Sequence, residues 1–225
     1  MRVAIVGAGE AGRSIARQLL DHGHEVLLIE REPTKIRHAS VPQAEWLLAD
    51  ACEMGSLVEA HLETCDVSVA ATRDDRANLV HALLAKTEFG VPRVVARVNQ
   101  PTNEWLFTSS WGVDVAVSAP SLMSAVVNEA VSTGELIELF AFANRDTALV
   151  SLKLPDTSPW LGHPVTDLPR LAGTVVTAVV RQGRPRVPDD AGDLEAGDQL
   201  IAIVARHAEA ALVEALTGRV EITVI

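Results

Sequence analysis

The stretch Val3–Glu30, VAIVGAGEAGRSIARQLLDHGHEVLLIE, decides the fold. Its pattern predicts a buried strand over Arg2–Val6, a glycine-rich turn over Gly7–Gly12, a helix over Arg13–His22 and a second strand over Glu25–Ile29. An apolar strand, a GxGxxG turn and an amphipathic helix in this order are typical of the βαβ unit that holds a dinucleotide. The alternative is a glycine turn in an α/β fold that binds no nucleotide.

Each glycine of the turn has a physical task. Gly7 lets the chain turn sharply out of the strand, Gly9 lets a pyrophosphate approach the backbone, and Gly12 lets the helix lie close to the sheet. The start of the helix offers free N–H groups and the positive end of its dipole to phosphates. Glu30 follows Gly12 by 30 − 12 = 18 residues, where a carboxylate can accept both hydroxyls of an adenosine ribose.

The composition narrows the class of protein. The 225 residues carry a net charge of −11 and no basic stripe, so we expect no nucleic-acid partner. Hydrophobic residues make up 48% of the chain, enough for a packed core, yet no apolar run reaches the roughly 18 to 20 residues that cross a bilayer. Without such a run, we expect a cytoplasmic protein. Cys52 and Cys65 lack metal-ligand spacing, so we expect two reduced thiols and no zinc site.

Strands and helices continue to alternate as far as residue 119. This pattern predicts an α/β fold with a Rossmann-like doubly wound parallel sheet, in which all strands end at one edge and ligands bind there. Further strands are predicted over Ala44–Ala49, Asp66–Ala70, Arg93–Val98 and Val113–Val117, and helices over Pro33–Ala39, Glu53–Leu62, Asp75–Glu88 and Pro101–Ser110.

Polar segments follow five of the predicted strands, and we expect them to line one crevice. Each also has an ordinary interpretation: Asp50 or Asp74 as a helix N-cap, Thr72 as a turn residue, Arg97 in a surface ion pair. Capping is the better interpretation of Asp74 and Asp75 taken alone. The shared position of the segments nevertheless favours a ligand site. These segments are Gly7–Gly12, Glu30–Arg31, Asp50–Cys52, Thr72–Asp74, and Arg97 with Asn99.

The character of the sequence changes after Gly134. Apolar alternation interrupted by prolines predicts a smaller α+β module of about ninety residues, joined to the first by a helix over Pro120–Thr133. Its strands are predicted within Glu135–Leu154 and over Gly173–Arg181, Asp198–Val204 and Val220–Ile225, with a helix over Ala208–Leu216.

Charged residues gather near the end of this module. The acids lack the spacing of a calcium-binding loop, so we expect them in a solvated hairpin, with the nearby arginines in a turn. The acids are Asp189, Asp190, Asp193, Glu195 and Asp198, and the arginines are Arg181, Arg184 and Arg186.

Several stretches beyond the glycine turn match the pattern of one family: ADACEMGSL (Ala49–Leu57), AATRDDRANL (Ala70–Leu79), VPRVVARVNQPTN (Val91–Asn103), VTAVVRQGRPRVPDD (Val176–Asp190) and GDQLI (Gly197–Ile201). With Val3–Glu30, they make the chain resemble the TrkA/KtrA family, cytosolic subunits that regulate potassium uptake and carry the RCK module (regulator of potassium conductance). The resemblance covers essentially the whole chain. It implies an RCK N-terminal domain over 1–119, a connector helix and hinge over 120–134, and a TrkA-C domain over 135–225.

This resemblance implies a bound nucleotide, NAD(H) or ATP/ADP. Glu30 would contact the adenosine ribose with Arg31 beside it, residues 50–52 would lie on the adenine side, and Thr72, Arg73 and Arg97 would face the phosphates or the distal half. The implied nucleotide-binding residues are Gly7, Ala8, Gly9, Glu10, Ala11, Gly12, Glu30, Arg31, Asp50, Ala51, Cys52, Thr72, Arg73 and Arg97.

The same resemblance implies a partner and a location. Members assemble into rings under a membrane potassium transporter or channel of the TrkH/KtrB type, which places the chain in the cytoplasm at the inner face of the plasma membrane. Many TrkA proteins carry the pair of modules twice, whereas this sequence shows no internal repeat. A ring would therefore form from copies of this chain or by pairing with a second TrkA-type chain.

Two departures from the family pattern bear on the nucleotide. ATP-responsive members often have arginine where this chain has Glu10, and a carboxylate there disfavours a γ-phosphate, although Arg13 can compensate. Such members also tend to carry an acid that helps bind a divalent cation where this chain has Ser121. Both departures favour NAD(H) over ATP with a metal ion.

An NAD-dependent oxidoreductase is the alternative function. It requires an acid or base and a substrate pocket facing the nicotinamide, and the second module offers only His163 and Lys153 without partner spacing. We therefore expect a regulatory subunit that is not an enzyme, with no catalytic residue and no metal site. Whether the second module senses a ligand or ion of its own is left open.

Overall fold

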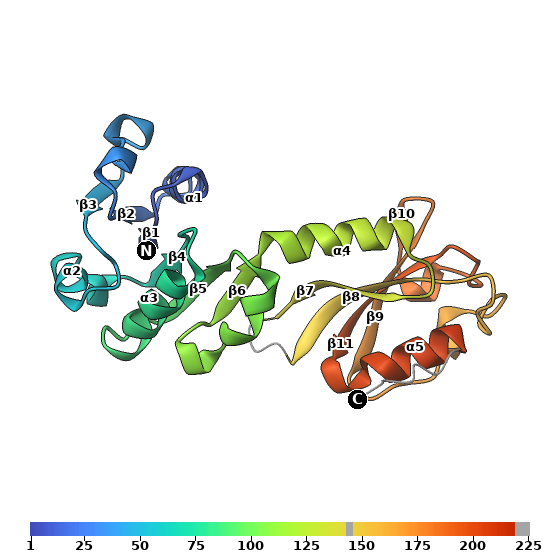
Figure 1. The fold of residues 1–225 in the computed structure, drawn as a ribbon. Coiled ribbons are helices and arrows are strands. Elements are labelled where there is room, and N and C mark those ends of the chain that lie inside the picture. Colours follow the sequence, from blue (N-terminus) through green and yellow to red (C-terminus); the bar gives the residue numbers. More distant parts are fainter. Residues whose placement is uncertain (143–145, 219–225) are drawn as a thin grey trace. The chain divides into compact units, whose positions relative to one another are not determined.

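The computed structural model describes residues 1–142 and 146–218, which form parts of two compact units, Met1–Pro120 and Ser121–Ile225 (Figure 1). The strand predicted over Val220–Ile225 lies outside the described residues. No helix among the described residues is long and apolar enough to cross a membrane.

The first unit is built on a six-stranded sheet in which every pair of neighbouring strands is parallel. Its order, β3-β2-β1-β4-β5-β6, reverses direction between β1 and β4, so the predicted Rossmann-like doubly wound sheet is confirmed. The strands are β1 (Arg2–Val6), β2 (Glu25–Glu30), β3 (Glu45–Leu48), β4 (Val67–Ala70), β5 (Arg93–Val98) and β6 (Val115–Ser118).

Helices cover both faces of this sheet, which explains why β1 and β2 are apolar almost throughout. Along β1, Val3 and Ile5 belong to the core under α1 (Glu10–Asp21), whereas Ala4 and Val6 belong to the core under the other helices. Those helices are α2 (Met54–Glu59) and α3 (Asp75–Thr87).

Three helices predicted for the first unit differ in the structure: two are 3₁₀ segments and one is shorter than predicted. The stretch Pro33–Ala39 forms two short 3₁₀ turns, and Pro101–Ser110 likewise forms 3₁₀ segments, because neither has an apolar face long enough to hold an α-helix on the core. The helix predicted over Glu53–Leu62 ends at Glu59 as α2. His61 adopts left-handed geometry (φ 49°) and breaks it there.

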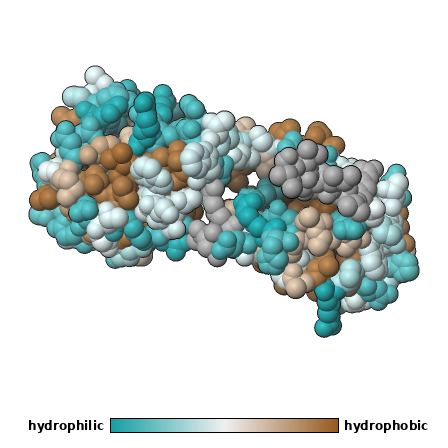
Figure 2. Space-filling view, turned by 60° about the horizontal axis from the view of Figure 1, so that its bottom comes forward, coloured by the Kyte–Doolittle hydropathy of each residue, from teal (hydrophilic) through white to brown (hydrophobic). Residues whose placement is uncertain are grey.

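The second unit combines helices with an antiparallel sheet of order β10-β9-β11-β8-β7, as the α+β prediction requires. Its core lies between the sheet and the last helix, and includes Val150, Leu152 and Leu216. The elements are α4 (Ala119–Val131), β7 (Leu136–Ala141), β8 (Thr147–Lys153), β9 (Thr174–Arg181), β10 (Arg184–Arg186), β11 (Gln199–Ala205) and α5 (Glu209–Thr217). On the surface of both units, hydrophobic residues are interspersed with hydrophilic ones (Figure 2).

The prediction of a solvated hairpin is wrong for Asp198, whose side chain is only 1% exposed. Arg181, the last residue of β9 rather than part of a turn, donates from Nε and Nη2 to the two carboxylate oxygens of Asp198, at 2.7 and 2.6 Å. It also donates from Nη1 to Glu195 at 2.6 Å. Asp198 is buried because Arg181 neutralises it in a bidentate ion pair at the edge of the core.

We expect Asp198→Ala to lower the free energy of unfolding by about 3 kcal/mol, because it leaves the guanidinium of Arg181 without its buried partner. Urea unfolding of the full chain measures this. The matched control is Glu195→Ala, which removes an exposed partner of the same arginine and should cost less than about 1 kcal/mol. Equal losses in the two variants would contradict the buried pair.

Candidate functional site

A cavity of about 750 Å³ lies where the parallel strands of the first unit end, at the point where the strand order reverses. Its volume is in the range of small-molecule sites in proteins. All of the predicted nucleotide-binding residues except Ala8 and Gly12 line it. Its walls come from residues of the glycine turn and the first turns of α1, from 29–37, from 49–52, from 71–77 and from Arg97.

The backbone of the glycine turn requires two of its glycines. Gly7 has a φ of +98°, and a Cβ there would lie 3.0 Å from the backbone of Thr72. A Cβ on Gly12 would lie 2.0 Å from the carbonyl oxygen of Gly7, which is impossible without moving the helix. At Gly9, in contrast, a Cβ would meet nothing within 4 Å, so the space above it is open to a ligand. The helix start at Gly9 has no side-chain cap.

The carboxylate of Glu30 ties this turn to the end of β2. It is 6% exposed, and it accepts the N–H of Ala8 at Oε2 (2.9 Å) and the N–H of Glu32 at Oε1 (3.0 Å). Ala8 therefore belongs to the frame of the site although it does not line the cavity. Each carboxylate oxygen has a second lone pair, so both can still accept a ribose hydroxyl.

The residues that line the cavity carry a small net positive charge, in contrast to the net charge of −11 of the whole chain. Within the part of the chain that the structure describes, four of the cationic side chains make no hydrogen bond or ion pair: Arg31, Arg37, Arg73 and Arg97. Six cationic residues line the cavity against five acids. The cations are Arg13, Arg31, Lys35, Arg37, Arg73 and Arg97, and the acids are Glu10, Glu30, Glu32, Asp50 and Asp74.

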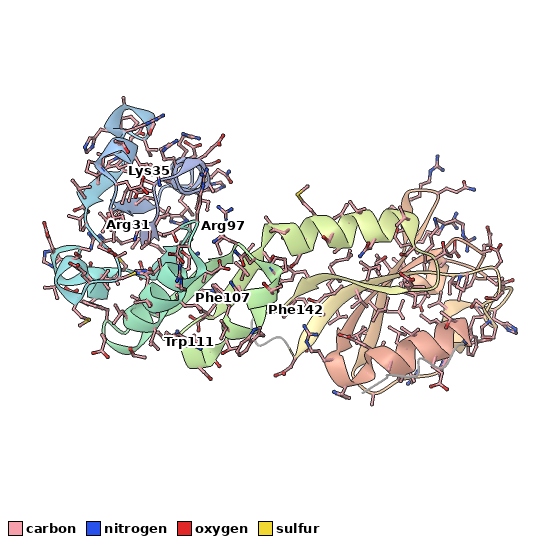
Figure 3. All side chains as sticks on the ribbon, viewed as in Figure 1. Arg31, Lys35, Arg97, Phe107, Trp111 and Phe142 are labelled. Atoms are coloured by element: carbon pink, nitrogen blue, oxygen red, sulfur yellow. The ribbon has the colours of Figure 1, made fainter. Side chains whose placement is uncertain are left out.

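These cations approach from different sides of the site. Figure 3 shows Arg31 and Lys35 near the end of β2, with Arg97 on the side of β4 and β5. Lys35 pairs with Glu32 at 2.7 Å, and this hydrogen bond lowers the pKa of Glu32. Arg13 reaches back from α1 and donates to the carbonyl oxygen of Ala8, so it supports the turn and adds charge beside it.

Sequence reasoning missed Lys35 and Arg37 because the segment that carries them was predicted as an ordinary helix. The available signal was the density of basic residues just after Glu30. The sequence left a helix N-cap as the alternative role of Asp50 and Asp74. Asp74 is indeed the N-cap of α3 and accepts the N–H of Arg76. Asp50 caps no helix; it accepts the N–H of Cys52 and so shapes the turn after β3.

The Cys52 thiol lies on the wall and is held as a neutral group. Burial, reinforced by the nearby charge of Asp50, raises its pKa to about 11. Its Sγ lies 3.7 Å from the carbonyl oxygen of Ala77 in α3. The thiol is therefore a packing group rather than a nucleophile.

A parallel doubly wound sheet, a glycine turn at its switch point and a carboxylate after β2 together define a domain of the Rossmann type. The TrkA-N domain family matches residues 3–119 and the TrkA-C domain family matches residues 149–217. The chain therefore belongs to the TrkA family.

Individual relatives agree with this membership. The chain is 48% identical over 209 residues to the Trk system potassium uptake protein TrkA of Mycobacterium tuberculosis, covering 93% of this chain and 95% of that protein. It is 27% identical over 219 residues to a TrkA homolog of Methanothermobacter thermautotrophicus, covering 97% of this chain and all of that protein.

Solved structures share the fold at low sequence identity. The GsuK channel bound to NAD matches with a TM-score of 0.62 at 15% identity, over 98% of this chain and 40% of that chain. This chain thus spans less than half of that channel polypeptide. The Kef C-terminal domain of Shewanella denitrificans in its AMP-bound form matches with a TM-score of 0.50 at 18% identity, over 58% of this chain and 79% of that chain.

The two glycines of the turn provide a matched pair of variants. We expect Gly12→Ala to lower the free energy of unfolding by at least about 2 kcal/mol, because its Cβ would overlap the Gly7 carbonyl. Gly9→Ala should cost no more than about 1 kcal/mol, because its Cβ has open space. Thermal unfolding of both variants measures the difference in stability. A Gly9 variant as unstable as the Gly12 variant would show that the space above the turn is not open.

The stability of the first unit should depend on the protonation of His81, which is fully buried under the site. Burial lowers its pKa to about 4, against the hydrogen bond to Ala51. Because the unfolded chain binds the proton at about pH 6.5, the stability from a neutral His81 is complete above that pH and is lost as the pH falls toward 4.

Urea unfolding between pH 7.5 and 4.5 measures this dependence. We expect the unchanged chain to lose stability more steeply than His81→Gln below pH 6.5, by up to about 1.4 kcal/mol per pH unit. Other titrating groups are common to both proteins and cancel in the difference. Parallel curves would contradict a neutral, buried His81.

Proposed function

We propose that this chain is a cytoplasmic, non-enzymatic subunit that binds a nucleotide at the cavity and thereby regulates a membrane potassium transporter or channel of the TrkH/KtrB type. The observation that carries the nucleotide is a cavity at an open glycine turn, lined by four arginines that make no hydrogen bond or ion pair within the described residues of a strongly acidic chain. Such a site attracts a phosphorylated anion. The potassium system is supported by the names of the TrkA relatives.

The order of the strands gives the nucleotide a direction. Its pyrophosphate lies over the glycine turn after β1, and its adenosine lies toward β2 and β3, where Glu30 and residues 50–52 are. The distal half then lies toward β4 and β5, where Thr72, Arg73 and Arg97 are. A cavity of about 750 Å³ that extends to both sides of β1 suits a dinucleotide.

NAD(H) is the favoured ligand, and ATP or ADP is the second candidate. Glu10 lines the cavity next to the glycine turn, where its carboxylate repels a γ-phosphate more than the shielded pyrophosphate of a dinucleotide. Structural neighbours of this fold include one bound to NAD and one in an AMP-bound form, which agrees with an adenine nucleotide of either kind.

Regulation follows from binding only if two states of an assembly bind the nucleotide with different affinity. We infer that this chain supplies one position in a ring, formed by its own copies or with a second TrkA-type chain, docked at the inner face of the plasma membrane. An NAD-dependent oxidoreductase is the alternative, and the regulatory subunit is favoured over it because the relatives are named as potassium uptake proteins.

Calorimetric titration of the full chain with NAD⁺, NADH, ADP and ATP, with and without Mg²⁺, tests the nucleotide. We expect NAD⁺ or NADH to bind most tightly, and Glu30→Ala to weaken that binding by about 1 to 3 kcal/mol, since it removes a charged acceptor of the ribose. Glu25→Ala is the matched control: it removes an exposed carboxylate at the other end of β2, away from the cavity wall, and should change affinity much less.

The outcomes separate the candidates. Tighter binding of ATP or ADP than of NAD⁺ and NADH would identify ATP or ADP as the ligand in place of NAD(H). Binding that Glu30→Ala leaves unchanged would contradict the position of the adenosine. Absence of binding by the unchanged chain would overturn the proposed nucleotide sensor.

A further inference from the structure

The face of α3 that packs on the sheet is polar in its first turns, where a buried helix face is normally apolar. Asp75, Asn78 and His81 follow one another at intervals of three residues, and they are 7%, 0% and 0% exposed. Farther along the same helix the buried positions are the small apolar residues Ala82 and Ala85. Each of the three polar side chains contacts a different segment that follows a strand end.

Asp75 orders the chain after β5. Its Oδ1 accepts from the backbone N–H and the side-chain amide of Asn99, at 2.7 and 2.8 Å, and its Oδ2 accepts from Gln100 and Asn103, at 3.1 and 2.9 Å. Burial alone raises the pKa of this carboxyl, but these hydrogen bonds outweigh burial and leave the pKa below its usual value. The carboxylate is a structural anchor for the turn.

Asn78 joins the ends of two neighbouring strands. Its Oδ1 accepts from the backbone N–H of Thr72 at 3.0 Å and from the hydroxyl of Thr72 at 2.6 Å. Its Nδ2 donates to the carbonyl oxygens of Arg97 at 2.8 Å and of Thr72 at 3.3 Å. All four hydrogen-bonding positions of the amide are therefore used.

His81 supports the opposite side of the cavity. Its Nδ1 donates to the carbonyl oxygen of Ala51 at 3.2 Å, because a carbonyl can only accept. Its Nε2 then accepts from the hydroxyl of Ser68 in β4 at 2.7 Å. The segment on the adenine side thus has a support that is separate from that of Thr72 and Arg97.

We propose that Asn78 is a positioning residue for the distal half of the nucleotide: it fixes Thr72 and the end of β5 so that Thr72 and Arg97 face the ligand beyond its pyrophosphate. The inference rests on the proposed nucleotide site. Asn78 does not line the cavity itself, and it acts through the two residues that do. Without its amide, the turn at Thr72 loses three hydrogen bonds to α3, and the end of β5 loses one.

This role predicts a selective effect on ligands of different length. AMP occupies only the adenosine side and the glycine turn, which Glu30 and the His81–Ala51 contact hold in place. NAD⁺ also reaches the distal half. We expect Asn78→Ala and Asn78→Asp to weaken NAD⁺ binding at least tenfold and to change AMP binding less than twofold.

Calorimetric titration of the full-length variants with NAD⁺ and with AMP measures this ratio. The matched control is Leu79→Ala, on the same helix, which empties part of the core without touching the cavity wall. It should lower the melting temperature but leave the ratio of the two affinities unchanged. If Asn78→Ala does not fold, Asn78→Asp keeps the side-chain volume and the two accepted hydrogen bonds and carries the comparison.

Equal losses for the two ligands, or an unchanged affinity for NAD⁺, would overturn the positioning role while leaving the nucleotide site intact. A shift of the ratio in Leu79→Ala as large as in the Asn78 variants would also overturn it, since any disturbance of α3 would then suffice. Failure of the unchanged chain to bind either ligand would instead overturn the proposed function, and this inference with it.

Discussion

The hydrogen bond from the Ala8 N–H to the Glu30 carboxylate fixes the glycine turn, on which the cavity of the first unit depends. It joins the turn after β1 to the end of β2. A backbone bond from the Gly7 N–H to the Ile29 carbonyl, 2.8 Å, adds a second link between the same segments. Helix α1 closes the turn from the third side, since Gly12 leaves no room above the Gly7 carbonyl. The turn is thus shaped by the protein alone, which reduces the ordering that a ligand must bring about.

Charge is the second constraint. The chain has a net charge of −11, yet four arginines line one cavity and make no hydrogen bond or ion pair with another described residue. A bound anion would give these guanidinium groups the charged partner that they lack among the described residues. Ligand binding and the stability of the first unit are therefore linked, because an anion that binds only the folded unit stabilises it by mass action. Glu30 and Glu32 limit the repulsion near Arg31 and Lys35 by placing negative charge among the cations.

The sequence was sufficient for features that depend on neighbouring residues and insufficient for those that depend on distant ones. Apolar runs and the glycine spacing predicted the strands, the parallel sheet and the edge at which polar segments gather. The buried ion pair of Arg181 with Asp198 was missed because the partners are 17 residues apart and meet only across paired strands. The tie from Asn78 to Arg97 spans 19 residues and depends on how α3 lies against β5. Lys35 and Arg37 were missed because the segment that carries them was predicted as an ordinary helix, whereas it forms two short 3₁₀ turns joined by residues 36 and 37.

Polar side chains of α3 support the two sides of the cavity through separate hydrogen bonds. His81 holds the segment after β3, whereas Asn78 and Asp75 hold the segments after β4 and β5. A ligand that contacts only one side of the cavity leaves the residues on the other side unchanged. A ligand that contacts both sides would hold the segments after β3, β4 and β5 in one arrangement. The same helix continues this connection through Asp75 to Asn103, in the 3₁₀ segment Pro101–Leu106 outside the cavity wall. If a nucleotide binds as we propose, occupancy of the distal half is therefore the difference between ligands that reaches the rest of the first unit through α3.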